Sequence, residues 1–205
     1  MFQDLIFALL RGNFICQVTH HEGYAYLQDE SGLRTVNDHL NKIGLQVICT
    51  EGGSAFFAAH LDGQDPDKRA AKKVFEEIKH ILRPCVEFLS LVMDVQKSDS
   101  VLFPGSLIEP NRLMASIDSN SAYLSELQKV ATLFKAGAAE TNNRGRLIKI
   151  LKRFEDDGFM RMIDEAREIY QVTGKIEYFH KALAYLMEHD GIETEEAMPA
   201  QGDLF

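Results

Sequence analysis

One order of predicted elements occurs twice in this 205-residue chain, and it restricts the possible folds more than any single motif does. Over residues 1–60 the apolar spacing predicts a helix, a short extended piece, two further helices and then two strands. Gly52 and Gly53 lie between the two strands. Because glycine accepts a positive φ, this pair predicts a tight hairpin turn. The order is the outline of a winged helix, a small helical unit that ends in a β-hairpin.

The second occurrence follows without a residue-level repeat of the first. Its predicted elements are a strand at 105–108, helices at 110–117, 121–135 and 144–157, a hairpin of 159–163 with 169–172, and a last helix at 175–189. The first helix of the chain is expected to turn one face inward, made of Leu5, Ile6, Leu9 and Leu10. We therefore predict a mainly α protein with small β wings (α+β), built as tandem winged-helix domains.

A domain boundary is predicted near residue 64. The run from Leu61 to Pro66 is polar and rich in turn residues, and Asp67 can cap a long helix after it, which Pro84 is expected to kink or divide. The predicted division has three parts: an N-terminal winged-helix domain at 1–63, a C-terminal winged-helix domain with a helical insertion at 64–189, and an acidic disordered tail at 190–205.

Composition excludes several classes of protein. With 22 basic and 31 acidic residues the net charge is −9, so the chain cannot coat nucleic acid over its whole surface, and any DNA contact must be local. No window reaches the ~18 apolar residues of a membrane span. Asp4 and the lack of a basic leader predict a short amphipathic helix rather than a signal peptide. We expect a cytoplasmic protein whose three cysteines are reduced.

The sequence has no recognisable catalytic or cofactor motif. It contains neither glycine-rich phosphate loop, and its acids fit solvated helix faces rather than an acid–base pair. The closest metal-like cluster, Cys16 with His20 and His21, lacks a fourth ligand. We predict no metal, no cofactor and no enzymatic activity.

The positive signal is a basic helix that begins at Arg144. Leu147, Leu151 and Phe154 fall on one of its faces, whereas the basic side chains fall on another. It directly precedes the second hairpin, where a winged helix places its recognition helix, and Arg161, Arg167 and Lys175 are expected nearby. No pattern selects base edges, so contact with the DNA backbone is predicted, from Arg144, Arg146, Lys149, Lys152 and Arg153. The alternative is a solvated helix balanced by an acidic partner subunit.

Three stretches resemble a known family. The first helix ends in Leu-Arg-Gly at Gly12, Leu40–Ile48 leads into Gly52–Phe57, and Leu147–Phe159 leads into Tyr170–Phe179. In this order they resemble the MukE/MksE subunits of bacterial SMC-type condensins, the kleisin-interacting tandem winged-helix elements. A longer segment at 119–141 favours the MksE-like branch.

The resemblance implies a non-catalytic, nucleoid-associated accessory subunit. Such a subunit forms a homodimer, binds the kleisin that joins it to an SMC-like ATPase, and helps to clamp DNA. It leaves open whether the complex serves chromosome condensation and segregation or plasmid defence. The alternative is a free-standing winged-helix transcriptional regulator, which needs base-reading residues on both recognition helices. The first such helix, 33–43, offers only Arg34, Asn37 and Lys42, offset by Asp38.

The last five residues form a possible peptide motif. Gln201, Asp203, Leu204 and Phe205 agree with the Q-L-[SD]-L-F motif by which bacterial proteins dock onto the replicative sliding clamp, whereas Gly202 replaces its leucine. The glutamine of such a motif binds one pocket, and the two apolar side chains fill an adjoining one. The alternatives are an accidental match and a tail that folds onto a neighbouring subunit.

Overall fold

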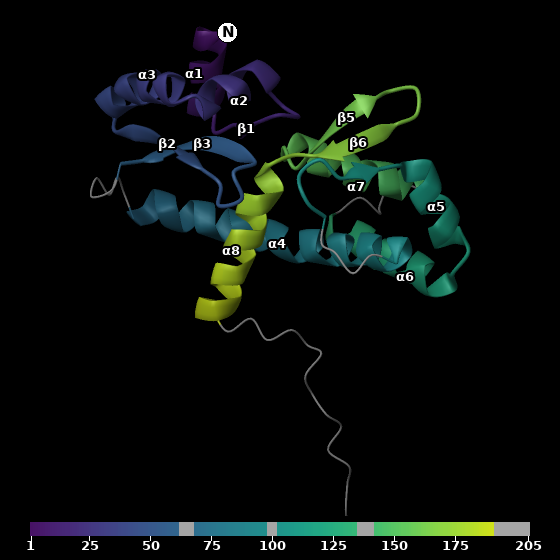
Figure 1. The fold of residues 1–205 in the computed structure, drawn as a ribbon. Helices are drawn as coiled ribbons and strands as arrows, with labels where there is room; N and C mark the ends of the chain where they lie inside the picture. The colour runs from purple at the N-terminus through teal and green to yellow at the C-terminus, as the bar shows by residue number, and fades with distance from the viewer. Residues whose placement is uncertain (62–67, 98–101, 135–141, 191–205) are drawn as a thin grey trace, which may run out of the picture.

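A computed structural model describes residues 1–61, 68–97, 102–134 and 142–190. Figure 1 shows two groups of helices, each accompanied by a β-hairpin, with the last helix between them. We call residues 1–61 the first half and residues 68–190 the second half. The mainly helical chain with small antiparallel sheets confirms the predicted mainly α fold with small β wings, whereas its division into tandem winged-helix domains stays a prediction. The boundary predicted at residue 64 lies outside the described residues.

The first half ends in the hairpin expected from Gly52 and Gly53. Its elements are α1 (Phe2–Leu10), β1 (Ile15–Cys16), α2 (His21–Gln28), α3 (Glu30–Leu40), the 3₁₀ turn η1 (Asn41–Ile43), β2 (Leu45–Cys49) and β3 (Ala55–His60). The strands form an antiparallel sheet in the order β1-β3-β2, in which Leu45 pairs with His60 and Cys49 with Phe56.

Local capping decides where α2 and α3 begin. The His20 ring accepts a hydrogen bond from the Gly23 N–H at 3.1 Å, and the Asp29 carboxylate accepts one from the Gly32 N–H at 3.1 Å. Because a side-chain acceptor satisfies a free amide of the first turn, a helix begins after such a residue. Asp29 therefore starts α3 three residues before the apolar pattern that begins at Leu33.

The second half repeats the order with more helix. Its elements are α4 (Lys68–Gln96), β4 (Leu107–Ile108), α5 (Pro110–Asp118), α6 (Ser121–Leu133), α7 (Asn143–Asp156), β5 (Met160–Asp164), β6 (Ile169–Val172) and α8 (Lys175–Asp190). Its antiparallel sheet has the order β4-β6-β5. Pro84 lies inside α4 without dividing it.

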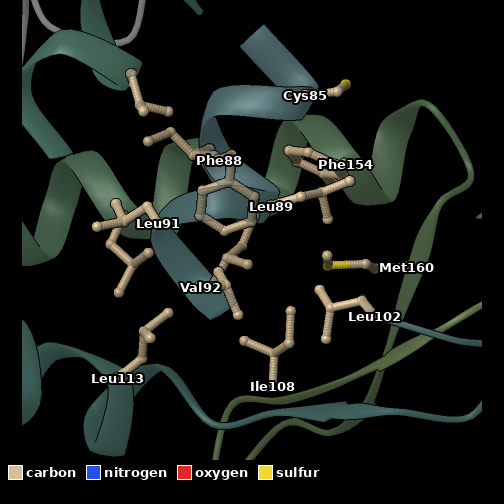
Figure 2. Packing of buried hydrophobic residues seen from close by; sticks show 14 of the residues in the cluster. Cys85, Phe88, Leu89, Leu91, Val92, Leu102, Ile108, Leu113, Phe154 and Met160 are labelled. Atoms are coloured by element: carbon tan, nitrogen blue, oxygen red, sulfur yellow. The ribbon is translucent and has the colours of Figure 1, made fainter. Parts of the chain in front are cut away.

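The core of the second half is built around aromatic rings. Figure 2 shows Phe88 of α4 facing Phe154 of α7, and their ring centroids are 4.9 Å apart. Phe154 also contacts the rings of Phe134 and Phe159. Cys85 is only 2% exposed, and burial raises its pKa to about 12, so it packs as a small apolar thiol, as expected. One continuous core thus joins α4, α7 and the second hairpin.

The core of the first half is smaller. Its buried residues are Leu5, Leu9, Ile15, Leu27, Val36, Leu40 and Phe56. Leu10, expected on the inner face of α1, is 44% exposed. A single turn of helix separates Leu5 from Leu9, and the next residue is rotated by about 100° away from that line. The expected inward position of Leu10 was therefore wrong.

Hydrogen bonds and an ion pair join the two halves. The Arg161 guanidinium of β5 donates to the carbonyl of Thr19 at 2.9 Å, and the Ser54 N–H donates to the Glu177 carboxylate of α8 at 3.4 Å. Lys181 pairs with Glu51 at 2.9 Å. The turn of the first hairpin is thus attached to α8.

Candidate nucleic-acid interface

The basic helix α7 is fixed at its start and along its inner face. Asn142 caps it, because its side-chain oxygen accepts a hydrogen bond from the Gly145 N–H at 2.6 Å. Its inner side chains are buried in the second core: Leu147, Ile150, Leu151 and Phe154. This packing leaves the other side of α7 to solvent.

The structure brings the predicted DNA-contacting residues onto the outside of this helix. Lys152 is exposed, and Arg144 and Arg153 have side chains 51% and 53% exposed. Arg146 and Lys149 are half-buried. The five positive charges therefore lie along one helix that faces solvent, although whether they bind DNA stays a prediction.

Acidic and amide partners that the sequence did not reveal hold the arginines in place. Arg144 forms an ion pair with Glu168 at the second hairpin, and Arg153 pairs with Asp157 at 2.8 Å. Arg146 donates to the side chain of Asn143 at 2.7 Å. Surface ion pairs contribute only about 0–1 kcal/mol each, and these two leave about half of each arginine side chain exposed.

Two of the three additional basic residues expected nearby serve the fold instead. Arg161 donates to the first half, as described above. Lys175 donates to the Asp157 carbonyl at 2.6 Å and lies 4.8 Å from the centroid of the Phe159 ring. Burial lowers its pKa, although the carboxylate of Asp157 opposes this effect. Arg167 stays largely exposed, with Asp164 at 3.8 Å.

The corresponding helix of the first half is less suited to bind DNA. On α3, Arg34 pairs with Glu30 at 2.9 Å. The Asn37 side-chain oxygen accepts a hydrogen bond from the Val47 N–H of β2 at 2.8 Å, so this acceptor is occupied within the fold. Lys42 remains exposed, with Asp38 also at the surface. This distribution weakens the case for a regulator that reads bases with both helices.

The described residues show neither a metal cluster nor a membrane-spanning helix. No group of three or more His, Cys, Asp and Glu side chains that could hold a metal ion occurs there. Within the same ranges no helix has the length and hydropathy needed to span a bilayer. The possible clamp motif, Gln201, Asp203, Leu204 and Phe205, lies outside the described residues.

Comparison with known families agrees with this architecture. The family model described as condensin complex protein MksE matches residues 1–184, which cover both hairpins and most of α8. No curated protein matches the chain. The match confirms the resemblance found in the sequence, so this chain belongs to the MksE family of condensin complex proteins.

Proposed function

We propose that this chain is a non-catalytic subunit that binds the kleisin of an SMC-type complex and helps to hold DNA through α7. The observation that carries the proposal is the exposed basic side of α7, in a chain that the condensin family model matches over residues 1–184. The kleisin would link the chain to the SMC-like ATPase, in the cytoplasm and at the nucleoid. The complex would either organise and segregate chromosomes or act in plasmid defence.

The proposed DNA contact is electrostatic and independent of sequence. Lysine and arginine on α7 would neutralise phosphates, and the release of counterions would make binding depend steeply on salt. The sequence of this helix contains no residue pattern that selects base edges. Because the whole chain carries a net charge of −9, we expect weak DNA binding by the isolated protein and stronger binding by the complex.

Copurification tests the proposed assembly. We expect the chain, tagged at its native chromosomal locus and purified from cells, to retain a kleisin and an SMC-like ATPase after a wash at moderate salt. Recovery of the chain with DNA but without either protein would instead support the free-standing regulator. Recovery of neither protein under mild washing would contradict the proposal.

We further propose that the chain forms a homodimer through the outer face of α1. Phe7 points away from the core and is 57% exposed, next to the exposed Leu10. Asp4 and Arg11 flank these two residues near opposite ends of the helix. Two copies of α1 packed antiparallel about a two-fold axis would therefore bury both apolar side chains and place Asp4 opposite Arg11 of the second copy.

Sedimentation tests this dimer. We expect wild-type protein at micromolar concentration to sediment as a dimer and Phe7→Glu to sediment as a folded monomer. Ile43→Glu, at another exposed apolar position of the first half, is the matched control and should remain dimeric. A Phe7→Glu protein that still dimerises would exclude α1 as the interface.

The tail motif supports a third, independent proposal, docking onto the replicative sliding clamp. From Glu188 to Asp203 the chain has acids but no Lys or Arg, and the apolar Leu204 and Phe205 follow this polar stretch. A labelled peptide of residues 190–205 should bind purified clamp, whereas the same peptide with Leu204→Ala and Phe205→Ala should not. Equal binding of the two peptides, or binding of neither, would exclude clamp docking.

A further inference from the structure

Glu168 in the turn of the second hairpin has an unusual backbone conformation. It directly precedes β6 and has a φ of +56°, in the left-handed region that glycine accepts and other residues rarely adopt. Strain of this kind persists where surrounding contacts hold the residue in place, and it is found often at functional sites. The contacts of the Glu168 side chain therefore need an explanation.

The Glu168 carboxylate contacts the basic helix. It pairs with the Arg144 guanidinium in the first turn of α7, and the same guanidinium donates to the Asn111 side chain of α5 at 3.3 Å. Arg144 thus joins three elements that are neighbours in Figure 1, namely the second hairpin, α5 and α7. Its side chain remains about half exposed, whereas Glu168 is partly buried.

The charge of Arg144 is unfavourably placed for the helix itself. The free N–H groups of a first turn carry partial positive charge, which repels a cation and attracts a carboxylate. The first turn of α7 contains no acidic residue, so Glu168 supplies from the hairpin the negative charge that Arg144 lacks locally. A DNA phosphate beside α7 would offer the same kind of charge to the same guanidinium.

We propose that Glu168 competes with DNA phosphates for Arg144 and so limits the affinity of α7 for the DNA backbone. A guanidinium that is paired with a carboxylate has already been neutralised, and the carboxylate itself repels a phosphate. Asn111 contacts Arg144 without adding a charge, so loss of the carboxylate would leave the guanidinium attached to α5. The inference rests on the proposed function, since it concerns the same contact between α7 and DNA.

Removing the charge of Glu168 tests this competition. The assembled complex, with each variant in place of the wild-type subunit, is titrated with a labelled duplex at several salt concentrations. We expect Glu168→Gln to raise affinity about two- to fivefold and to steepen the slope of log K against log salt by up to about 1, because one more phosphate is neutralised. The matched control is Glu165→Gln, which removes the same charge from an exposed position of the same turn and should leave affinity within about 1.5-fold of wild type.

A double-mutant cycle identifies Arg144 as the group that gains access to DNA. With Glu168 present, Arg144→Gln should change affinity little, whereas in the Glu168→Gln background the same substitution should remove the whole gain. Glu168→Gly also relieves the positive φ, so it should raise affinity as Glu168→Gln does without a folding defect. Thermal melting checks that each variant is folded.

Three results would overturn the competition: no gain of affinity in Glu168→Gln, an equal gain in Glu165→Gln, or additive effects in the cycle. The proposed function fails separately. If affinity is unchanged in Glu168→Gln but falls when Arg146, Lys149 and Arg153 are replaced by Glu, only the role of Glu168 is overturned. If the second variant also binds DNA as wild type does, both proposals are overturned.

Discussion

In both hairpins a side chain accepts a hydrogen bond from an amide of the edge strand. β2 and β5 are edge strands of their sheets, and unpaired edge amides invite association with other chains. In the first half Asn37 of α3 accepts the hydrogen bond of the Val47 N–H, and in the second half Glu155 of α7 accepts that of the Met162 N–H. In both cases the helix that precedes the hairpin provides the side chain.

The surroundings of the two hairpins differ. The turn of the first hairpin lies against α8 through Glu177 and Lys181, whereas the second hairpin carries Glu168, which pairs with Arg144 of α7. The turn of the first hairpin is therefore attached to α8, whereas the second hairpin contacts the basic helix through Glu168 and the first half through Arg161. The two hairpins thus occupy equivalent positions in the order of elements but make different contacts. The side chains at and around each turn determine these contacts.

The largest expected effect concerns the two cores. Phe154→Ala removes a ring that contacts three other phenylalanines and should destabilise the protein by about 3–5 kcal/mol. Leu9→Ala in the first core should cost about 2–5 kcal/mol. Urea unfolding followed by circular dichroism measures both losses. If the halves unfold as one unit, each variant should give one transition, and a separate early transition in either would show that they unfold independently.

Close packing at Gly174 should produce the next largest effect. A β-carbon there would lie 2.7 Å from Cβ of Ala55 and against the Ser54 carbonyl, so Gly174→Ala should cost about 1–3 kcal/mol by forcing the halves apart. Gly53 has a φ of +76° but open space around it, so Gly53→Ala should cost only about 1 kcal/mol through backbone strain. Chemical denaturation compares the stability of the two variants. A larger loss of stability in Gly53→Ala than in Gly174→Ala would contradict close packing between the halves.

The edge amides allow a direct comparison of the hairpins. Asn37→Ala and Glu155→Ala each leave one amide without its side-chain acceptor and should cost about 1 kcal/mol. Amide hydrogen exchange at Val47 should accelerate only in Asn37→Ala, and exchange at Met162 only in Glu155→Ala. Faster exchange at both amides in either variant would indicate a wider disturbance.

The smallest expected effect is a dependence of stability on pH at Glu177. Burial alone would raise its pKa, but hydrogen bonds from Thr50, Ser54 and the Gly52 backbone outweigh burial and lower it. The carboxylate therefore stabilises the fold above its unfolded pKa, and this contribution is lost as pH falls through the folded value. Melting temperature should fall less steeply below about pH 4.5 in Glu177→Gln than in wild type. If melting temperature fell equally with pH in both proteins, the contact of Glu177 with the first hairpin would be contradicted.

Local signals made most of the fold predictable. Gly52 and Gly53 predicted the first hairpin through their own backbone freedom, and apolar spacing predicted helices at 110–117 and 144–157, where the structure has α5 and α7. Pro84 was harder to interpret, since Leu82 before it and Cys85 after it both pack into the core of the second half.

The contacts between the two halves could not be predicted from the sequence, and the reason is physical. Arg161 bonds to Thr19 and Glu177 bonds to Ser54 across more than a hundred residues of sequence, and no periodicity encodes such pairs. The basic side of α7 was visible because helical spacing alone determines it. Its partners Asp157 and Glu168 were visible in the sequence as acids, but only the structure shows which arginine each one pairs with.

DNA binding by the assembled complex tests most directly the claim that the second half, and not the first, contacts DNA. Replacing Arg146, Lys149 and Arg153 by Glu should lower affinity for all duplex sequences and reduce the slope of log K against log salt by about 3. Replacing Arg34 and Lys42 of the first half by Glu should leave affinity and slope near wild type. Unchanged affinity and slope in the α7 variant, or a loss confined to the first-half variant, would contradict the account.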